Sequence, residues 1–373
     1  MQISAAFDGG NIVVEKADDP SDIRLAVRKD INAEFLQWFD FRLAGARDRD
    51  CVITITNAGA CSYTKGWEGY QAVASYDLER WFRVPTSYDG KVLTIRHRPE
   101  HDLVEYAYFA PYPYQCHRNL LATMQTRAGV RAGVLGQTVE GRDMDVLETG
   151  EGPLQLWFIG RQHPGETQAS WWMEGFLDRL TDPVDALARS LKQAGTFHVV
   201  PHMNPDGAIA GNLRTNAVGT NLNREWQEPS EERSPEVFHV RRRMQDTGVD
   251  FMLDVHGDEG LPYNFIAGPS GITGYDPKLL ELSDRFCSAL KQVNPDFQTE
   301  HGYPKVPEGK ADLRICCKHV ASAFGCLAMT LEQPFKDSAI TPMPDEGWSP
   351  ERCARLGAAA LDAVAAVIAD LRL

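Results

Sequence analysis

The segment Arg161–Glu166 places His163 three residues before Glu166, with a Pro-Gly pair between them. Imidazole nitrogens and carboxylate oxygens are common zinc ligands, so a tight turn at Pro-Gly lets both side chains reach one ion. The His-x-x-Glu pattern is weak by itself, because chance pairing or a histidine that caps the next helix explains most of its occurrences. A metal site and a structural histidine therefore both stay open at this point.

A second histidine follows the apolar run Phe251–Val255 directly. His256 and the glycine after it end what reads as a buried strand, and such strands rarely end in this way unless the end faces a site. His256 would supply the third ligand of a catalytic zinc, which leaves the fourth position for water. The alternative is a hydrogen-bonded histidine in the core.

Glu332 stands at the end of a third apolar run, Cys326–Leu331. A carboxylate near a metal can accept the proton of a metal-bound water and so act as general base. The alternative for Glu332 is an ion pair with an arginine in the interior.

The segment Asn204–Trp226 reads as a long loop rich in asparagine and arginine. Arginine binds carboxylates with two parallel hydrogen bonds, and asparagine adds neutral donors. Arg214, Asn223 and Arg224 therefore suit a site for a substrate carboxylate. The alternative is a solvated loop whose arginines pair with surface acids.

The chain after about residue 113 alternates short apolar strands with stretches of helical spacing. We expect strands at Leu154–Ile159, Phe197–Val200, Phe251–Val255 and Cys326–Leu331, and helices at Gln168–Leu180, Pro235–Thr247, Asp276–Gln292 and Pro350–Leu373. Strands of this kind indicate a mostly parallel sheet with helices on both faces. Chemistry in such sheets gathers outside the carboxyl ends of the strands, which is where the two histidines and two glutamates would meet.

The first 110 residues have a different pattern, with short alternating strands separated by turn signals. Strands are expected at Asp22–Arg28, Phe35–Leu43, Cys51–Asn57, Trp81–Pro85, Lys91–His97 and Val104–Ala110. This spacing is typical of an antiparallel β-sandwich. Pro111 and Pro113 interrupt any regular element, so we place a β-sandwich domain at residues 1–112 and an α/β domain at 113–373.

Composition narrows the functional classes. The 373 residues have an ordinary hydrophobic fraction of 43% and a net charge of −14, which argues against nonspecific binding of nucleic acids or anionic membranes. No apolar run is long enough to span a bilayer, and the first residues do not resemble a secretory signal. The eight cysteines show no metal-binding or disulfide spacing, so we expect free thiols in a cytoplasmic protein. Nothing in the sequence argues for or against a homo-oligomer.

The chain from about residue 113 to 373 resembles the M14 zinc carboxypeptidases, and the cytosolic carboxypeptidase subfamily, related to the tubulin-processing deglutamylases, is most similar. The matching motifs are His163-Pro-Gly-Glu166, Asn204-Pro-Asp-Gly207, Gly211-Asn-Leu-Arg214, Asn221-Leu-Asn-Arg224, Asp254-Val-His256-Gly and Thr330-Leu-Glu332. The N-terminal β domain and the Pro111–Tyr114 junction also resemble this subfamily. The implied fold is a mixed sheet of about eight strands between helices.

The resemblance also implies roles for individual residues. One Zn²⁺ per chain would be bound by His163, Glu166 and His256, and Glu332 would serve as general base and then general acid. Arg214 would polarise the scissile carbonyl, while Asn223 and Arg224 would hold the terminal carboxylate. The reaction would be attack of a zinc-activated water on the C-terminal peptide or isopeptide bond of a peptide or protein.

Two further positions follow from the resemblance. The family has a mobile tyrosine on a loop before the glutamate strand, and Tyr303 is the nearest candidate. Members that prefer C-terminal glutamate place a basic residue in the side-chain pocket. Arg314 is the first candidate for that residue and Lys318 the second, with a surface role for Arg314 as the alternative.

Two other functions compete with the carboxypeptidase. One is a zinc amidohydrolase of small N-acyl amino acids, similar to the desuccinylase and aspartoacylase branch, which shares the zinc ligands but has closed pockets. The other is a binding module without catalysis, which is disfavoured because all three ligand positions and the base position are filled.

Overall fold

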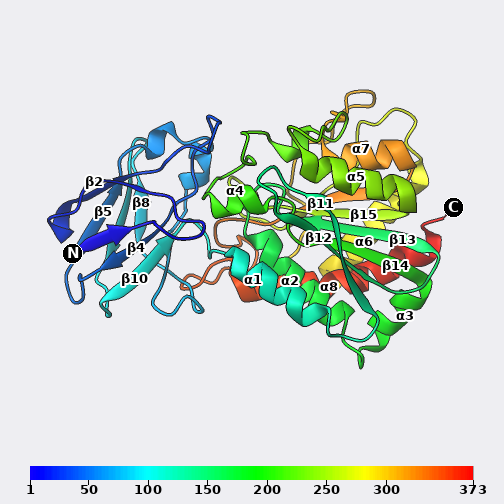
Figure 1. Cartoon of the computed structure of the whole chain (residues 1–373), viewed down its shortest axis with the longest axis horizontal. Coiled ribbons are helices and arrows are strands. Elements are labelled where there is room, and N and C mark those ends of the chain that lie inside the picture. Colours follow the sequence, from blue (N-terminus) through cyan, green and yellow to red (C-terminus); the bar gives the residue numbers. More distant parts are fainter. Residues whose placement is uncertain (373) are drawn as a thin grey trace.

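The computed structural model describes residues 1–372 and shows two lobes side by side along its long axis (Figure 1). The N-terminal lobe consists of two five-stranded sheets, β1-β4-β10-β6-β7 and β2-β3-β5-β9-β8. All strand pairs are antiparallel except β3 with β5. The bounds are β1 Gln2–Ser4, β2 Val13–Lys16, β3 Ile23–Ala26, β4 Asp40–Ala44, β5 Cys51–Ile55, β6 Val73–Ser75, β7 Phe82–Arg83, β8 Thr86–Tyr88, β9 Leu93–His97 and β10 Leu103–Ala107.

Alternating residues of the two N-terminal sheets form one apolar core. Ile53 and Ile95 of one sheet and Phe41 and Tyr106 of the other are fully buried in a single cluster. Each of the six predicted strands overlaps an observed strand, although the observed strands are shorter. The predicted β-sandwich at the N-terminus is thus present.

The second lobe is built on a seven-stranded mixed sheet with the order β11-β12-β14-β13-β15-β17-β16. Parallel pairing joins the four central strands, and the three outer pairings are antiparallel. The bounds are β11 Val130–Gln137, β12 Asp143–Thr149, β13 Leu154–Gly160, β14 Gly195–Val200, β15 Phe251–Val255, β16 Phe265–Ala267 and β17 Leu327–Glu332. The mixed α/β architecture is as predicted, with seven strands rather than about eight in the described residues and with parallel pairing limited to the centre.

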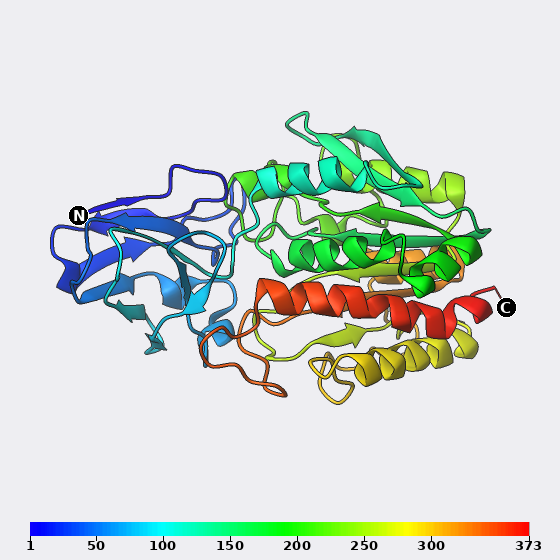
Figure 2. The same ribbon diagram turned by 90° about the horizontal axis from the view of Figure 1, so that it is seen from below.

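Helices cover both faces of this sheet. One face packs against α2, α3, α6 and α8, and Figure 2 shows α2 and α8 lying across it. The other face packs against α5 and α7. The bounds are α1 Tyr114–Met124, α2 Gln168–Leu180, α3 Ala186–Ala194, α4 Pro205–Ile209, α5 Pro235–Thr247, α6 Pro277–Val293, α7 Cys316–Phe324 and α8 Pro350–Val367.

Both faces of the central strands are buried, which explains their uninterrupted apolar sequence. In β13, Phe158 belongs to the core beneath α2 and α8, whereas Trp157 and Ile159 belong to the core beneath α5. The four predicted helices are confirmed within a few residues. The predicted helix 350–373 ends at Val367 and continues as a short 3₁₀ turn, and residue 373 lies outside the described residues.

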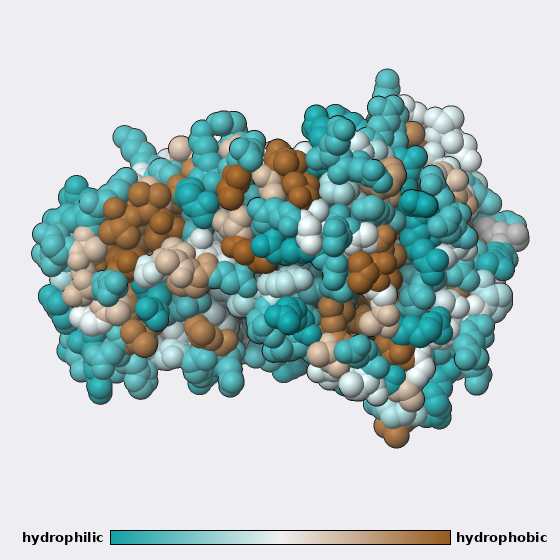
Figure 3. All heavy atoms as spheres, viewed as in Figure 1, coloured by the Kyte–Doolittle hydropathy of each residue, from teal (hydrophilic) through white to brown (hydrophobic). Residues whose placement is uncertain are grey.

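The face in Figure 3 is mostly hydrophilic, with small hydrophobic groups between the charged side chains. Within residues 1–372, no helix is long and apolar enough to cross a membrane.

Candidate active site

The His163–Glu166 turn lies between the end of β13 and the start of α2. Arg161 has a φ of 61° at the strand end, and its buried side chain stabilises the turn through hydrogen bonds. Its Nε donates to the carbonyl of Pro164 at 2.6 Å, and Nη1 donates to Ser170 Oγ at 2.9 Å. A compact turn is thereby fixed, as the Pro-Gly pair predicts.

His163, Glu166 and His256 meet at one point. The Nδ1 atom of His163 lies 2.7 Å from Glu166 Oε1, and the Nδ1 atom of His256 lies 2.8 Å from Glu166 Oε2. The two Nδ1 atoms are 3.2 Å apart. One ligand atom from each residue lies within 4.8 Å of the others, and all three residues are buried. Two imidazoles and one carboxylate at this spacing are the donor set of a catalytic zinc.

Polar residues behind His256 orient its ring. His256 Nε2 lies 2.8 Å from Asp254 Oδ2, so this nitrogen carries the proton and Nδ1 faces the cluster. Gln162 Nε2 donates to the same Asp254 oxygen at 2.6 Å, and Trp226 Nε1 donates to Gln162 Oε1 at 2.8 Å. Such partners behind a ligand fix its tautomer and strengthen metal binding.

The electrostatics of the cluster favour a positive charge at its centre. Burial acts to lower the pKa of His256, but the carboxylates of Asp254 and Glu166 outweigh it and raise that pKa well above its usual value. Burial and then the charge of Arg214 lower the pKa of His163 to about 4, so its imidazole is neutral and free to bind metal. Burial opposes ionisation of Glu166, yet the two histidines lower its pKa. The residues fit a zinc ion.

Glu332 lies beside this cluster because β15 and β17 are parallel neighbours. Val255 pairs with Leu331, and the N–H of His256 donates to the carbonyl of Leu331 at 2.8 Å. Glu332 is 7% exposed and lines the cavity in front of the cluster, and its Oε2 makes no hydrogen bond within the described residues. Burial, reinforced by Glu166, raises its pKa well above the usual carboxyl value.

The cationic and amide candidates share this cavity. Arg214, Asn223 and Arg224 line it together with the three cluster residues and Glu332. The side chain of Asn223 is fixed by the N–H of Cys316, which donates to Oδ1 at 2.8 Å, while Arg224 Nη1 donates to the carbonyl of Asn223 at 2.6 Å. The predicted carboxylate-binding residues are thus gathered next to the cluster.

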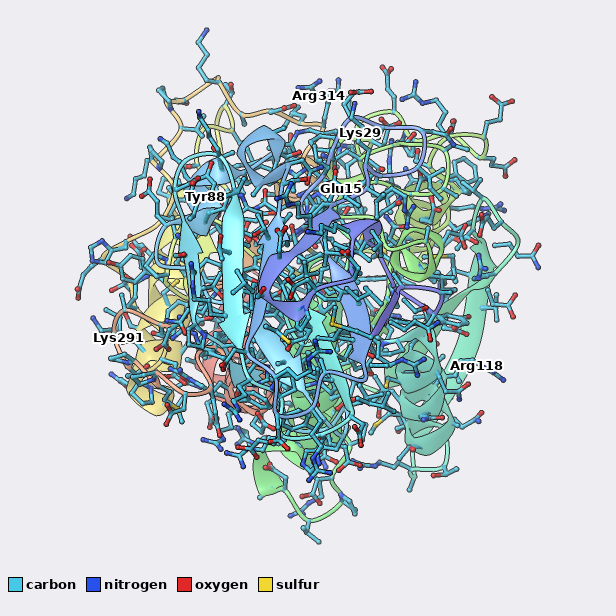
Figure 4. All side chains as sticks on the ribbon, turned by 90° about the vertical axis from the view of Figure 1, so that its left-hand side faces the viewer. Glu15, Lys29, Tyr88, Arg118, Lys291 and Arg314 are labelled. Carbon is cyan, nitrogen blue, oxygen red and sulfur yellow. The ribbon has the colours of Figure 1, made fainter. Side chains whose placement is uncertain are left out.

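The other three candidates have different positions. Tyr303 lines the cavity, and its hydroxyl donates to Asp258 Oδ2 at 2.6 Å. Arg314 is not among the lining residues: it pairs with Asp312, its side chain is 61% exposed, and Figure 4 shows it at the outer edge of the molecule. Lys318 does line the cavity, and its ammonium donates to the carbonyls of Gly268 and Ser270 at 2.5 and 2.7 Å.

The cavity has a volume of about 1100 Å³ and is shared by both lobes, because Tyr63 and Lys65 of the N-terminal lobe line it. Its walls contain a further buried acid, Glu259, whose pKa burial and the nearby Glu166 raise to about 8. A space of this size exceeds the usual pocket for a small molecule and can hold several residues of a peptide.

Sequence reasoning assigned no role to Asp254, Gln162 or Glu259. A signal existed for Asp254, because residues two apart in a strand face the same side, and Asp254 precedes His256 by two. Gln162 and Glu259 lie in turns, whose side-chain directions follow from no simple periodicity.

A buried two-histidine, one-carboxylate cluster at the carboxyl ends of parallel strands, with a glutamate opposite, defines a zinc hydrolase site. A family model described as zinc carboxypeptidase matches residues 118–332, and one described as cytosolic carboxypeptidase N-terminal domain matches residues 3–109. The chain belongs to the M14 zinc carboxypeptidase family. It is therefore a zinc-dependent hydrolase that acts on the C-termini of peptides.

The chain is also similar to individual relatives and solved structures. The chain is 47% identical to an uncharacterised protein of Zymomonas mobilis over 100% of this chain and 97% of that protein. It is 28% identical to cytosolic carboxypeptidase 6 of Mus musculus, over 72% of this chain and 55% of that protein. A metallo-carboxypeptidase from Pseudomonas aeruginosa, solved with (2-guanidinoethylmercapto)succinic acid, superposes with a TM-score of 0.98 at 46% identity, over 100% of both chains. A metallo-carboxypeptidase from Burkholderia cenocepacia gives 0.96 at 46% identity, also over 100% of both chains.

Proposed function

We propose that this protein is a cytoplasmic metallocarboxypeptidase whose single zinc is bound by His163, Glu166 and His256 and whose general base is Glu332. The observation that carries the proposal is the meeting of these residues in one cavity with Arg214, Asn223 and Arg224. The name of the mouse relative, a cytosolic carboxypeptidase, supports the location.

Glu332 and Arg214 have different tasks in the proposed reaction. Bound zinc supplies Lewis-acid chemistry, because it lowers the pKa of water and polarises a carbonyl. Glu332 accepts the proton of the attacking water and then passes it to the leaving amine, a transfer suited to a carboxyl group with a raised pKa. Arg214 donates to the carbonyl oxygen as negative charge develops there.

Asn223 and Arg224 restrict the reaction to the end of a chain. Arg224 can form paired hydrogen bonds with a terminal carboxylate, and the amide of Asn223 adds a neutral donor. Asn223, Arg224 and Glu332 line one cavity. A peptide whose terminal carboxylate lies against the first two residues therefore places its last amide bond near Glu332.

Lys318 supports a preference for an acidic terminal side chain. Two of its three N–H donors bind the carbonyls of Gly268 and Ser270, and the third remains for a substrate carboxylate. The lysine, rather than the exposed Arg314, is therefore the proposed reader of the terminal residue.

A basic terminal residue is the second candidate. The Pseudomonas aeruginosa enzyme was solved with a ligand that carries a guanidino group, and acidic residues such as Asp284 and Glu300 line the cavity of this chain. The negative charge of these lining residues is thus a specific reason to compare peptides that end in an acidic residue with peptides that end in a basic residue.

A panel of peptides ending in Glu, Lys or Phe, together with N-acetyl-glutamate and N-succinyl-glutamate, tests these assignments by release of the free amino acid. We expect hydrolysis of peptides, preference for terminal Glu, and loss of that preference in Lys318→Met but not in the exposed control Lys278→Met. Glu332→Gln should keep its zinc and lose about 10²- to 10⁴-fold in kcat. Turnover of the N-acyl amino acids alone would favour the small-molecule amidohydrolase, and unchanged kcat in Glu332→Gln would refute the role of this glutamate.

A further inference from the structure

The backbone around Arg214 is bound by a residue of the other lobe. Asp30 lies between β3 and β4 in the N-terminal lobe, and it is 3% exposed. Its Oδ1 accepts from the N–H of Leu213 at 2.6 Å, and its Oδ2 accepts from the N–H groups of Arg214 and Thr215 at 2.8 and 2.9 Å. The Thr215 hydroxyl also donates to Oδ2, at 3.0 Å. One carboxylate therefore fixes three consecutive peptide groups centred on Arg214.

Other residues of the N-terminal lobe bind the same segment on both sides of Arg214. The contacts run from Ala210 to Ala217 and use side chains and backbone of residues 11–32. They are Arg28 Nη2 to the carbonyl of Ala210 (2.9 Å), Asn11 Nδ2 to the carbonyl of Gly211 (2.7 Å), the N–H of Ile31 to Asn212 Oδ1 (3.0 Å) and Asn32 Nδ2 to the carbonyl of Ala217 (3.0 Å). The segment thus follows the surface of the N-terminal lobe along its whole length.

Two glycines permit this close approach. Gly211 and Gly219 have φ values of 71° and 79°, which favour glycine. A Cβ on Gly211 would lie 2.7 Å from the carbonyl oxygen of Gly10, and one on Gly219 would lie 2.2 Å from that of Asn32. Side chains at these positions would force the segment and the N-terminal lobe apart.

The guanidinium of Arg214 is also held by the N-terminal lobe. It lies 5.7 Å from the ring centre of Phe35 and 5.6 Å from that of Tyr63, within the range of cation–π attraction. Within residues 1–372 the guanidinium makes no hydrogen bond or ion pair, so its donors remain free to face the cavity. The N-terminal lobe therefore fixes both the backbone and the charged end of this arginine.

We propose that Asp30 is a positioning residue for catalysis: through its hydrogen bonds to residues 213–215, the N-terminal lobe sets the place of Arg214 at the scissile carbonyl. This inference rests on the proposed role of Arg214 in the carboxypeptidase reaction. It assigns the N-terminal lobe a part in the active site of its own chain, in addition to any contact it makes with substrates.

The first test measures the segment directly. In Asp30→Asn, the amide group replaces one acceptor oxygen by a donor, so the three N–H groups lose their shared carboxylate. Hydrogen–deuterium exchange of the peptide that covers residues 210–217 should become faster, while exchange in β15 stays unchanged. Asp89→Asn is the matched control, because Asp89 also accepts from two backbone N–H groups in the N-terminal lobe but lies in an exposed turn. Unchanged exchange in Asp30→Asn would overturn the proposal.

The second test measures catalysis in the full-length zinc-loaded chain. Asp30→Asn should lower kcat roughly 10- to 100-fold, because a misplacement of 1 Å can cost about 100-fold. KM should change little, since Asn223 and Arg224 hold the terminal carboxylate and zinc content stays at one per chain. In an Arg214→Ala background the same substitution should have no further effect on kcat. An equal loss of kcat with and without Arg214 would show a general structural role and refute the positioning role.

Phe35→Leu gives a milder variant if Asp30→Asn does not fold. It removes one ring beside the guanidinium and leaves the backbone contacts intact, so kcat should fall in the native background and not in Arg214→Ala. A normal kcat in Arg214→Ala alone would refute the proposed role of Arg214 itself. Loss of kcat in Arg214→Ala with normal kcat and exchange in both Asp30→Asn and Phe35→Leu would refute only the role of the N-terminal lobe.

Discussion

The hydrogen bond between His256 and Asp254 makes a specific prediction about zinc affinity. Asp254 is fully buried, and its Oδ2 receives both His256 Nε2 at 2.8 Å and Gln162 Nε2 at 2.6 Å. In Asp254→Asn the negative charge is lost, and an amide NH₂ that faces His256 would make Nε2 an acceptor. The ring proton would then move to Nδ1, which is the atom that faces Glu166 and His163.

The expected loss of zinc affinity follows from the role of a carboxylate that accepts a hydrogen bond from a metal-binding histidine. Removal of such a partner typically costs 10- to 100-fold in metal affinity. This range corresponds to about 1.4–2.7 kcal/mol, since a tenfold change is about 1.36 kcal/mol. Asp254→Asn should therefore bind zinc 10- to 100-fold more weakly than the parent. Peptidase activity should return when free zinc is raised by the same factor, because the residues that contact the substrate are unchanged.

Competition with a chromogenic zinc chelator at neutral pH measures the affinity directly. Asp250→Asn is the matched control. Asp250 lies just before the amino end of β15, whereas Asp254 lies near the carboxyl end of the same strand. The carboxylate of Asp250 accepts from the N–H of Gln155 and from the side chain of Arg372 at the amino end of β15, whereas the cluster lies at the carboxyl end of that strand. Asp250→Asn should bind zinc like the parent. Parental zinc affinity in Asp254→Asn would refute the reasoning about the histidine tautomer.

Two predictions concern stability. Gly175→Ala places a Cβ 1.9 Å from the backbone oxygen of Ala354, where α2 packs on α8. The substitution should lower the free energy of unfolding, measured in urea, by about 1–3 kcal/mol. Gly133→Ala is the control and should leave this free energy unchanged, because its Cβ meets nothing closer than 3.5 Å. Glu148 accepts hydrogen bonds from His198 and Arg243, which lower its pKa to about 2. Its contribution to the free energy of unfolding is therefore complete above about pH 4.5, the pKa of a glutamate in the unfolded chain, and is lost as pH falls toward 2. Glu148→Gln should therefore cost about 1–3 kcal/mol at pH 7 and almost nothing at pH 2, and an equal cost at both pH values would contradict this.

Local sequence patterns predicted the central elements well, for identifiable reasons. Strands such as Phe251–Val255 are buried on both faces and read as short apolar runs, while Pro235–Thr247 begins with proline at its first helical position and shows helical spacing. The hairpin of β11 and β12 was not predicted, because most of β11 is exposed and carries two glycines and little apolar periodicity. The sequence patterns also do not predict β16 or the helices α1, α3, α4 and α7, and α4 lies within the segment 204–226 that reads as a loop.

Among the candidate site residues, those at strand ends are easier to place from sequence than those in loops or on short helices. His256 and Glu332 stand at the ends of recognisable strands, so their place at one sheet edge could be expected from sequence. For the pocket, the sequence offers Arg314 and Lys318 as candidates and leaves a surface role open for Arg314. In the structure Arg314 pairs with its neighbour Asp312 at the surface, whereas Lys318 points inward from α7. Residues in loops and on short helices have no periodicity that fixes their direction.

The amino-acid sequence alone is enough to place two histidines and two glutamates directly after parallel strands, and hence at one sheet edge. That follows because strand ends are local features and parallel strands bring their carboxyl ends together. Two other features become visible only in the folded chain. Asp30, 184 residues from Arg214 in the chain, binds the backbone of the arginine, and Asp254 and Gln162 lie behind His256 and set its tautomer. Contacts between distant segments depend on how the two lobes pack, and no local pattern encodes that packing.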